Sequence, residues 1–301
     1  MDRFHHMQVF VAVADTAGFA PAARKLRLSP PAVTRAIAGL EERLGVPLFH
    51  RTTRQVRLTA AGERFLEDCR RILAEIEEAE ESAAGAHRQP RGRLMVTAPI
   101  RFGCMHVAPL LMEFLERYPE VSAQTLFVDR IVNLLEEGLD VAIRIGELPD
   151  SSLTAIPAGA VRRVICASPA YLEARGIPEV PADLRAHDTV LFSGLTPRAE
   201  WSFRGGDGHL TVPVSARLTV NTADVAICAA SSGQGLTQLL SYMVAPELTA
   251  GRLKIVLADY ETAPSPIHVV YQEGRKAAGR VRAFVDFMVD RLRTVASIRE
   301  L

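Results

Sequence analysis

Residues 59–87 read T-A-A-G-E-R-F-L-E-D-C-R-R-I-L-A-E-I-E-E-A-E-E-S-A-A-G-A-H, and the rest of the chain is organised around this stretch. It contains no proline, and its glycines lie near its two ends. Apolar or small residues recur along it at alternating steps of four and three: Phe65, Cys69, Ile72, Ile76, Ala79 and Ala83. This spacing is typical of the seam along which one helix packs against a partner helix.

A helix over these residues would be roughly 40 Å long at ~1.5 Å per residue, too long for a small neighbouring domain to bury. Glutamates at positions 75, 77, 78, 80 and 81 would keep its other faces in water. We therefore predict that residues 59–87 form a linker helix, which dimerises through the six seam residues and joins two unlike domains. The alternative interpretation is an amphipathic helix packed on its own chain.

The composition is that of an ordinary globular protein. The chain has 301 residues, of which 48% are hydrophobic and 23% charged, and this leaves room for two or three domains. The sequence contains no run of eighteen apolar residues, the length needed to span a membrane. The first residues lack the basic and then apolar pattern of an export signal. The four cysteines lack the paired spacing of a disulfide framework or a zinc site. We expect a cytoplasmic protein without metal, cofactor or membrane association.

The distribution of charge indicates a nucleic-acid partner, although the net charge of the whole chain is zero. Residues 1–58 carry nine Lys and Arg against four Asp and Glu, a net charge of +5. Residues 59–86 carry three against eight, a net charge of −5. A basic domain beside an acidic helix is typical of a domain that faces phosphates.

The basic first domain predicts three helices. Apolar residues at helical spacing begin at Phe4, Gly18 interrupts the pattern, and residues 19–26 give a second, short helix. A third helix begins near Ser29, which can serve as its N-cap. The two prolines that follow fall in its first turn, where their missing N–H groups need no partner.

The third helix has two different faces. Its apolar face consists of Val33, Ile37, Leu40 and Leu44, and the opposite face carries Pro31, Thr34, Arg35 and Ala38. Small and hydrogen-bonding residues with one arginine suit a helix that lies in a major groove, because arginine can bind guanine with two hydrogen bonds and threonine can contact base edges. The alternative for this face is an ordinary solvated surface.

A basic hairpin follows the third helix. Residues 45–50 end the helix and begin a strand, and residues 51–58, R-T-T-R-Q-V-R-L, contain three arginines and no acidic residue. Hairpin arginines beside a groove-reading helix would contact phosphates or a narrow minor groove. Three helices and a basic hairpin predict a winged helix-turn-helix domain over residues 1–58.

The stretch 22–62, A-A-R-K-L-R-L-S-P-P-A-V-T-R-A-I-A-G-L-E-E-R-L-G-V-P-L-F-H-R-T-T-R-Q-V-R-L-T-A-A-G, resembles the signature of LysR-type transcriptional regulators. The resemblance implies that Pro31, Thr34 and Arg35 face base edges and that Arg54 is the arginine of the wing. With the helix faces above, the predicted DNA-binding set is Phe19, Ala22, Ala23, Ser29, Pro30, Pro31, Ala32, Thr34, Arg35, Ala38, Arg51, Thr53 and Arg54. Pro30 stands where many members carry a polar residue, often glutamine, so a base contact common in the family is missing.

After residues 87–92 the pattern changes to strands that alternate with helices. We predict strands over 93–97, 121–128 and 140–144, with helices over 104–118 and 131–138 between them. A second unit of this kind opens with the strand 163–168, and a late strand over 267–271 precedes a last helix over 280–293. This alternation predicts an α/β fold with parallel sheets covered by helices.

The resemblance extends to this second part. LysR-type regulators carry an effector domain similar to the two-lobed periplasmic binding proteins, and D-V-A-I-R-I-G (140–146), A-S-P-A-Y-L (167–172), W-S-F (201–203) and V-A-P-E-L-T-A-G-R-L (244–253) match it. The resemblance implies an effector-binding domain over 88–301. Its first lobe would comprise 91–161 and 268–301, and its second lobe 162–267.

In such folds the ligand lies at the carboxyl ends of strands, near helix amino termini. The predicted effector-binding residues are Thr97, Ala98, Pro99, Ile100, Val128, Asp129, Arg144, Ile145, Gly146, Phe203, Asn221 and Thr222. Arg144 would pair either with an anionic effector, an organic anion or aromatic, or with an acid such as Asp129. For Asn221 and Thr222, capping of the helix that begins at Ala223 is favoured over a role in ligand binding.

The sequence therefore predicts a regulator that binds an inverted repeat in double-stranded DNA as a homodimer or homotetramer, responds to a small molecule and contacts RNA polymerase. An enzyme is disfavoured, because Cys104 and His106 are two residues apart on a helix and point in different directions. Two alternatives remain: a thiol-based redox regulator that uses Cys104, near Arg101, and a protein that packs DNA without regard to sequence.

Overall fold

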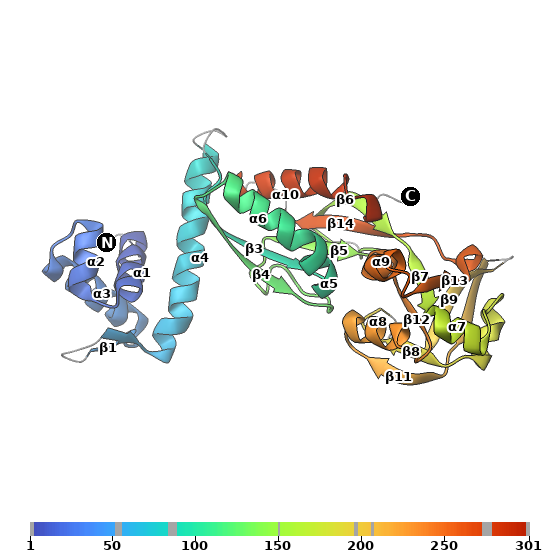
Figure 1. Cartoon of the computed structure of the whole chain (residues 1–301). Helices are drawn as coiled ribbons and strands as arrows, with labels where there is room; N and C mark the ends of the chain where they lie inside the picture. The colour runs from blue at the N-terminus through green and yellow to red at the C-terminus, as the bar shows by residue number, and fades with distance from the viewer. Residues whose placement is uncertain are drawn as a thin grey trace. The chain divides into compact units, whose positions relative to one another are not determined.

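The computed structural model describes residues 3–51, 56–83, 89–149, 151–195, 198–205, 208–272 and 279–298. The chain divides into two compact units, Met1–Arg88 and Gln89–Leu301. Figure 1 shows the helices and strands of each unit. Along the described ranges no helix is both long enough and apolar enough to cross a membrane.

The first unit contains three short helices, a hairpin and one long helix. In chain order they are α1 (Arg3–Thr16), α2 (Phe19–Leu26), α3 (Pro30–Leu44), β1 (Phe49–Arg51), β2 (Val56–Leu58) and α4 (Ala60–Ala83). The two strands are antiparallel, with Phe49 opposite Leu58. The predicted order of three helices, hairpin and long helix is confirmed.

Aromatic rings hold the core of this unit together. Phe10 of α1 is fully buried and lies 5.2 Å from the ring of Phe49 and 5.5 Å from the ring of Phe65, centroid to centroid. Val33 and Ile37 of α3 are fully buried in the same cluster. The core therefore joins α1, α3, the hairpin and the first turns of α4.

The prediction for the first part of the linker helix is wrong at Cys69. This residue is fully buried in the core of the unit itself and is not available as a seam residue for another chain. Phe65 is partly buried against the same core, with its ring 5.5 Å from the ring of Phe10 of α1, so its seam role stays a prediction. The amphipathic-helix alternative describes these turns correctly. Ile72 and Ile76 are half-buried, and Ala79 and Ala83 lie in the helix, but their side chains are outside the described residues.

The second unit contains two five-stranded sheets, which define two lobes. Lobe I has the strand order β4-β3-β5-β14-β6, formed by β3 (Gly92–Ala98), β4 (Val121–Phe127), β5 (Val141–Ile145), β6 (Thr154–Val161) and β14 (Ser265–Tyr271). Lobe II has the order β11-β8-β12-β7-β13, formed by β7 (Arg163–Ala167), β8 (Thr189–Phe192), β11 (Ala216–Val220), β12 (Leu236–Leu240) and β13 (Lys254–Val256). A hairpin of β9 (Glu200–Gly205) and β10 (Gly208–Pro213) adds to lobe II.

Helices cover these sheets. They are α5 (Ile100–Phe102), a π-helical turn (Gly103–Val107), α6 (Ala108–Arg117), α7 (Pro169–Arg175), α8 (Ala223–Ser231), α9 (Ser241–Thr249), α10 (Gly279–Leu292) and 3₁₀ turns over Pro181–Ala186, Ala258–Tyr260 and Ala296–Ile298. In lobe I, α10 packs beside α6, where the rings of Phe114 and Phe284 lie 5.1 Å apart (Figure 1). The apolar core is continuous between the lobes.

The sheets differ from the prediction in strand direction. β3 is parallel to β4 and β5, and β8 is parallel to β11 and β12. However, β14 is antiparallel to both β5 and β6, and β7 is antiparallel to both β12 and β13. The sheets are mixed because the chain crosses from lobe I to lobe II after β6 and returns at β14, and an apolar run does not encode the direction of a crossing strand.

The helix predicted over 131–138 is absent, and this segment forms turns. The side chain of Asn133 accepts a hydrogen bond from the backbone N–H of Leu135 at 3.1 Å, which replaces the helical pattern with a local turn. Gly138 has a φ of +63°, which ends the segment. Ile131 is 90% exposed and Leu135 60% exposed, so the apolar spacing here did not mark a buried helix face.

Candidate functional site

Helix α3 separates an apolar face from a polar one as predicted, except that Leu44 in its last turn is exposed rather than part of the buried face. Val33, Ile37 and Leu40 are fully buried, whereas Thr34 and Arg35 are exposed. The other exposed residues of the same surface are Ser29, Pro30, Pro31 and Ala38. Ser29 occupies the N-cap position and both prolines lie in the first turn, although the Ser29 side chain makes no capping hydrogen bond. The helix therefore presents a continuous surface of small side chains around one arginine.

The Arg35 side chain makes no hydrogen bond or ion pair with any residue that the structure describes. The hydroxyl of its neighbour Thr34 donates to the carbonyl of Pro30 at 3.1 Å, which leaves the Thr34 methyl group and a lone pair at the surface. A cation held on a rigid helix without an internal partner is free to bind an external anion or base edge.

Four residues of the predicted DNA-binding set do not lie freely on this surface. Ala22 and Ala23 are 0% and 2% exposed, because α2 packs against α1 and α3 through them, and their predicted role is wrong. Phe19 is half-buried, with its ring 6.0 Å from the ring of Phe49. Ala32 is also half-buried. Thr53 and Arg54 fall outside the described residues, as does the side chain of Arg51, so the prediction of a wing contact stays a prediction.

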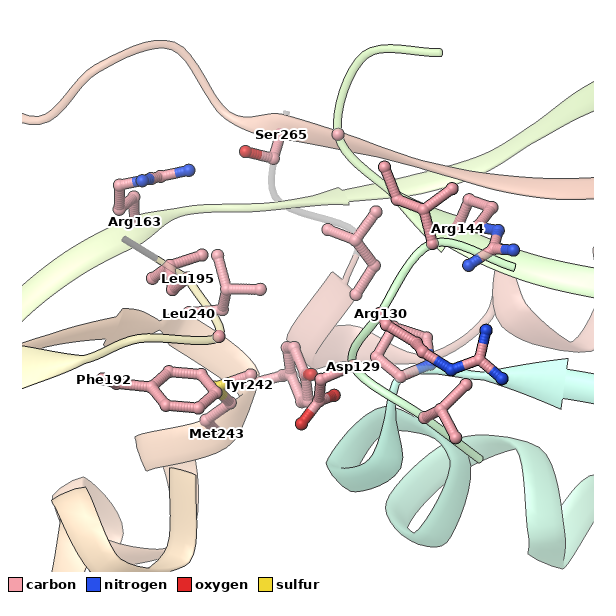
Figure 2. Close-up of a pocket in the computed structure, with 16 residues that line it drawn as sticks. Asp129, Arg130, Arg144, Arg163, Phe192, Leu195, Leu240, Tyr242, Met243 and Ser265 are labelled. Carbon is pink, nitrogen blue, oxygen red and sulfur yellow. The ribbon is translucent and has the colours of Figure 1, made fainter. Parts of the chain in front are cut away.

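The second unit contains a cavity of about 180 Å³ between its lobes (Figure 2). Six residues of the predicted effector-binding set line it: Pro99, Val128, Asp129, Arg144, Ile145 and Gly146. Lobe II contributes a group that the sequence did not indicate: Arg163, Phe192, Gly194, Leu195, Leu240, Tyr242 and Met243. Arg130, Ile131 and Ser265 complete the lining.

The other six predicted residues do not line this cavity. Thr97 and Ala98 are fully buried in β3, and the backbone N–H of Ile100 donates to the Asp129 carboxylate at 3.0 Å. Phe203 is buried in a separate core under the β9–β10 hairpin. Asn221 and Thr222 follow β11, at the sheet edge most distant from β7. Thr222 occupies the N-cap position of α8, without a side-chain hydrogen bond.

The direction of β7 explains what the sequence missed in lobe II. We predicted that ligand-binding residues lie at the carboxyl ends of strands. The lining residues Phe192 of β8 and Leu240 of β12 do lie at the carboxyl ends of their strands. Because β7 is antiparallel to β12, it brings its amino end, Arg163, to the same edge. The direction of β7 is not encoded in its local sequence, so the sequence alone does not identify Arg163 as a cavity residue.

The arginines on the lobe I side already have internal partners. Arg130 forms a two-bond ion pair with Glu137 at 2.8 and 3.0 Å. Arg144 donates to the carbonyl of Val132 at 2.9 Å, and burial lowers its pKa. The ion pair suggested between Arg144 and Asp129 is not found among the described residues, and the Asp129 carboxylate instead accepts the hydrogen bond from Ile100.

Two side chains on the lobe II side have no polar partner among the described residues. Arg163 is partly buried, burial lowers its pKa, and its side chain makes no hydrogen bond or ion pair within the described ranges. Tyr242 is fully buried, yet its hydroxyl has no hydrogen-bond partner in the described structure. Burial, with the nearby Asp129 carboxylate, raises the pKa of Tyr242, so its hydroxyl keeps its proton at neutral pH.

Contacts between the lobes adjoin the cavity. Arg101, directly after α5 begins, donates through Nε to the carbonyl of Met243 at 3.2 Å and also pairs with Asp224 of α8. The rings of Phe102 and His106 lie 5.2 and 5.6 Å from the ring of Tyr242. A change in the cavity that moves the start of α9 therefore acts directly on α5 of the other lobe.

The cysteines lie in different environments. Cys69 and Cys166 are buried, and burial raises the pKa of their thiols to about 11 and about 12. Cys104 is exposed, whereas the ring of His106 packs against Phe102 at 4.8 Å. The Cys104 thiol and the His106 imidazole therefore do not form the nucleophile and base pair that an enzyme of this type would need.

Comparison with known proteins gives both units a family. Residues 4–63 match the family model for bacterial regulatory helix-turn-helix proteins of the lysR family, and residues 87–293 match the model for the LysR substrate binding domain. An HTH-type transcriptional regulator from Xanthomonas campestris pv. campestris is 36% identical over 288 residues, which cover 94% of this chain and 84% of that protein.

Two further similar proteins cover nearly the whole chain. An HTH-type transcriptional repressor from Pseudomonas aeruginosa is 35% identical over 292 residues, 96% of this chain and 92% of its own length. The structure of CrgA, a LysR-type transcriptional regulator from Neisseria meningitidis, is 32% identical, with a TM-score of 0.62 and coverage of 96% of this chain and 98% of that chain. On the evidence of both units, the chain belongs to the LysR family of transcriptional regulators.

Proposed function

We propose that this regulator binds an inverted-repeat promoter site in double-stranded DNA through the exposed surface of α3, and that a small molecule in the cavity between the lobes changes its activity. The observation that carries the DNA-binding part is the surface of α3 around Arg35, a cation without an internal partner in the described residues. Arginine on a groove-facing helix can donate two hydrogen bonds to guanine.

The inverted repeat follows from symmetry. A dimer related by a two-fold axis presents two α3 helices in opposite directions, so its site must carry the same sequence on both strands. With Cys69 committed to the core of its own unit, we assign dimerisation to the later turns of α4, from Ile72 onward. Assembly to a tetramer and contact with RNA polymerase belong to the same proposal, as the family's mode of action implies.

The regulatory part requires that the effector bind one arrangement of the lobes more tightly than another. The contact from Arg101 to the first turn of α9 supports such coupling, because the cavity residues Tyr242 and Met243 belong to that turn. Occupancy of the cavity would change the angle between the lobes, and in an oligomer this alters the spacing of the DNA-binding units.

A gel-shift titration of Arg35→Ala tests the DNA-binding part. One duplex is the region upstream of the protein's own gene, and the other is a shuffled duplex of equal composition. We expect wild-type protein to prefer the natural duplex, and Arg35→Ala to lose ~1–3 kcal/mol of binding to it with little change on the shuffled one.

Arg43→Ala is the matched control, because Arg43 is an exposed arginine in the last turn of the same helix. It should leave the preference for the natural duplex unchanged. Equal losses of Arg35→Ala on both duplexes would make Arg35 a phosphate contact. Equal wild-type affinity for both duplexes would contradict sequence-specific regulation.

A further inference from the structure

The charged groups around the cavity do not balance. Arg130, Arg144 and Arg163 line it together with a single carboxylate, Asp129. Glu137 neutralises Arg130 through two hydrogen bonds, so the remaining groups are two arginines and one aspartate. A partly buried site with a surplus positive charge favours an anion, because an uncompensated charge away from water is destabilising.

Of these two arginines, Arg163 is the one whose side chain has no partner in the described part of the chain. Arg144 already donates to the Val132 carbonyl at 2.9 Å and lies near Glu137, whose charge acts on it. Glu261 shares a small neighbouring cavity with Arg163, but its carboxylate is bound by Arg162 at 3.2 Å. Among the described residues, therefore, no acid forms an ion pair with the Arg163 side chain.

The surroundings of Arg163 define the rest of the ligand. Phe192, Leu195 and Leu240 lie with Arg163 on the lobe II side of the cavity in Figure 2, across from Asp129. These side chains offer an apolar surface beside the guanidinium group. The Asp129 carboxylate on the opposite side would repel a second anionic group, so a ligand with one anionic end and an apolar body fits this arrangement.

The Tyr242 hydroxyl supplies the second polar contact. It is buried, protonated and without a partner in the described structure. A buried donor that lacks an acceptor costs free energy. A ligand oxygen that accepts from it would satisfy this group. The cavity of about 180 Å³ suits a small ligand.

We propose that the effector is a small organic monoanion, a carboxylate with a short apolar body, whose charge is bound by Arg163 and whose oxygen accepts from the Tyr242 hydroxyl. This rests on the proposed function of the cavity as the effector site. Arg144, the arginine expected from the sequence, instead holds the segment around Val132 in place.

Calorimetric titration of the full chain tests the proposal. The probes are benzoate, 4-hydroxybenzoate, phenylacetate and hexanoate, each paired with its neutral primary amide. We expect at least one acid to bind, and its amide to bind at least about tenfold more weakly, which is roughly 1.4 kcal/mol. In Arg163→Gln this preference for the acid should nearly disappear, and Arg163→Lys should keep part of it.

Two further variants separate the contributions. Tyr242→Phe should weaken acid and amide by a similar factor, because both carry an oxygen that accepts from the hydroxyl. Arg217→Gln is the matched control, because Arg217 is an exposed arginine of lobe II outside the cavity, and its removal should change neither affinity. Melting temperatures of all variants identify any that fail to fold.

Several results would overturn the proposal. These are a preference for the amides, an acid preference that survives Arg163→Gln, the same loss in Arg144→Gln alone, or no binding of any probe acid at millimolar concentration. Gel shifts without ligand report the DNA-binding part separately. Intact preference for the natural duplex with failed acid binding would refute the ligand class and leave the regulator assignment standing.

Discussion

Two glycines of the first unit lie inside helices, where alanine is favoured by up to about 1 kcal/mol. A Cβ at Gly62, in the first turns of α4, would lie 2.2 Å from the backbone oxygen of Leu48. A Cβ at Gly39, in α3, would meet only the ring of His6 at 3.8 Å, an ordinary contact. Helix propensity alone therefore gives the same sign for both, and only the surroundings separate them.

We predict that Gly62→Ala destabilises the first unit and that Gly39→Ala stabilises it. The contact at Leu48 involves backbone, which cannot rotate away, so a cost on the order of 1–3 kcal/mol exceeds the helix preference. Gly39→Ala should gain about 0.5–1 kcal/mol. Differential scanning calorimetry of the full chain measures both, and a rise in stability for Gly62→Ala would contradict the geometry.

His106 gives the second unit a predictable pH dependence. Burial against Phe102 and Tyr242 lowers the pKa of His106. A histidine whose pKa is lower in the folded state contributes stability above its unfolded pKa of ~6.5 and loses it as the pH falls through the folded pKa. The unit should therefore become less stable as the solution is acidified.

We predict that His106→Phe reduces the fall in melting temperature between about pH 7.5 and about pH 5.5. The fall should not vanish, because burial and Arg175 also lower the pKa of His187. His209→Ala, which removes an exposed histidine of β10, is the control and should behave like the wild type. An unchanged slope in His106→Phe would exclude His106 as a contributor.

At the scale of elements, α4 serves two purposes along its length. Its first turns belong to the core of the first unit through Leu66 and Cys69, and Arg70 pairs with Asp15 of α1. Its later turns, with Ile72 and Ile76 half-buried, have less to pack against in the described residues. The repeat of four and three residues runs through both parts without a break.

We predict that substitutions in the first turns of α4 change stability, whereas substitutions in its later turns change association. Cys69→Ser places a hydroxyl in the core and should cost ~1–3 kcal/mol of stability without changing the association state. Ile76→Asp should shift the protein towards monomer in sedimentation velocity. The melting temperature of the first unit, measured at a low concentration where the protein is monomeric, should change little. A dimer unaffected by Ile76→Asp would show that another surface holds the copies together.

At the scale of the whole molecule, polar contacts from Arg101 join the two lobes of the second unit. They go to the Met243 carbonyl and to Asp224, whose side chain is 69% exposed. Where the chain passes from β6 to β7, Arg162 forms an ion pair with Glu261 at 3.2 Å. The partly buried bond from Arg101 to Met243 should contribute more than the exposed ion pair, which water screens.

We predict that Arg101→Ala lowers the melting temperature of the second unit by about 2–6 °C, for a loss of roughly 1–2 kcal/mol. Asp224→Asn removes only the exposed ion pair and should lower it by no more than about 2 °C. Hydrogen exchange of the first turn of α9 should rise in Arg101→Ala. Equal effects of the two variants would mean that the Met243 contact contributes nothing.

Local patterns in the sequence determined much of this protein. The faces of α3 could be predicted because Val33, Ile37 and Leu40 recur at the helical period, and the prolines at 30 and 31 mark its start. The hairpin, the change from helices to alternating elements and half of the predicted cavity residues also followed from local signals. These features could be predicted because they depend on residues that are close together in the chain.

Tertiary structure decided the rest. Phe65 and Cys69 show the same spacing as Ile72 and Ile76, but only the fold reveals that the first pair packs with the core of the first unit. The helix expected over 131–138 gave way to a turn around Asn133, and Arg163 reached the cavity only because β7 runs antiparallel to β12. A periodic pattern states which face of an element is apolar, whereas the partner of that face and the direction of a strand depend on contacts between residues far apart in the chain.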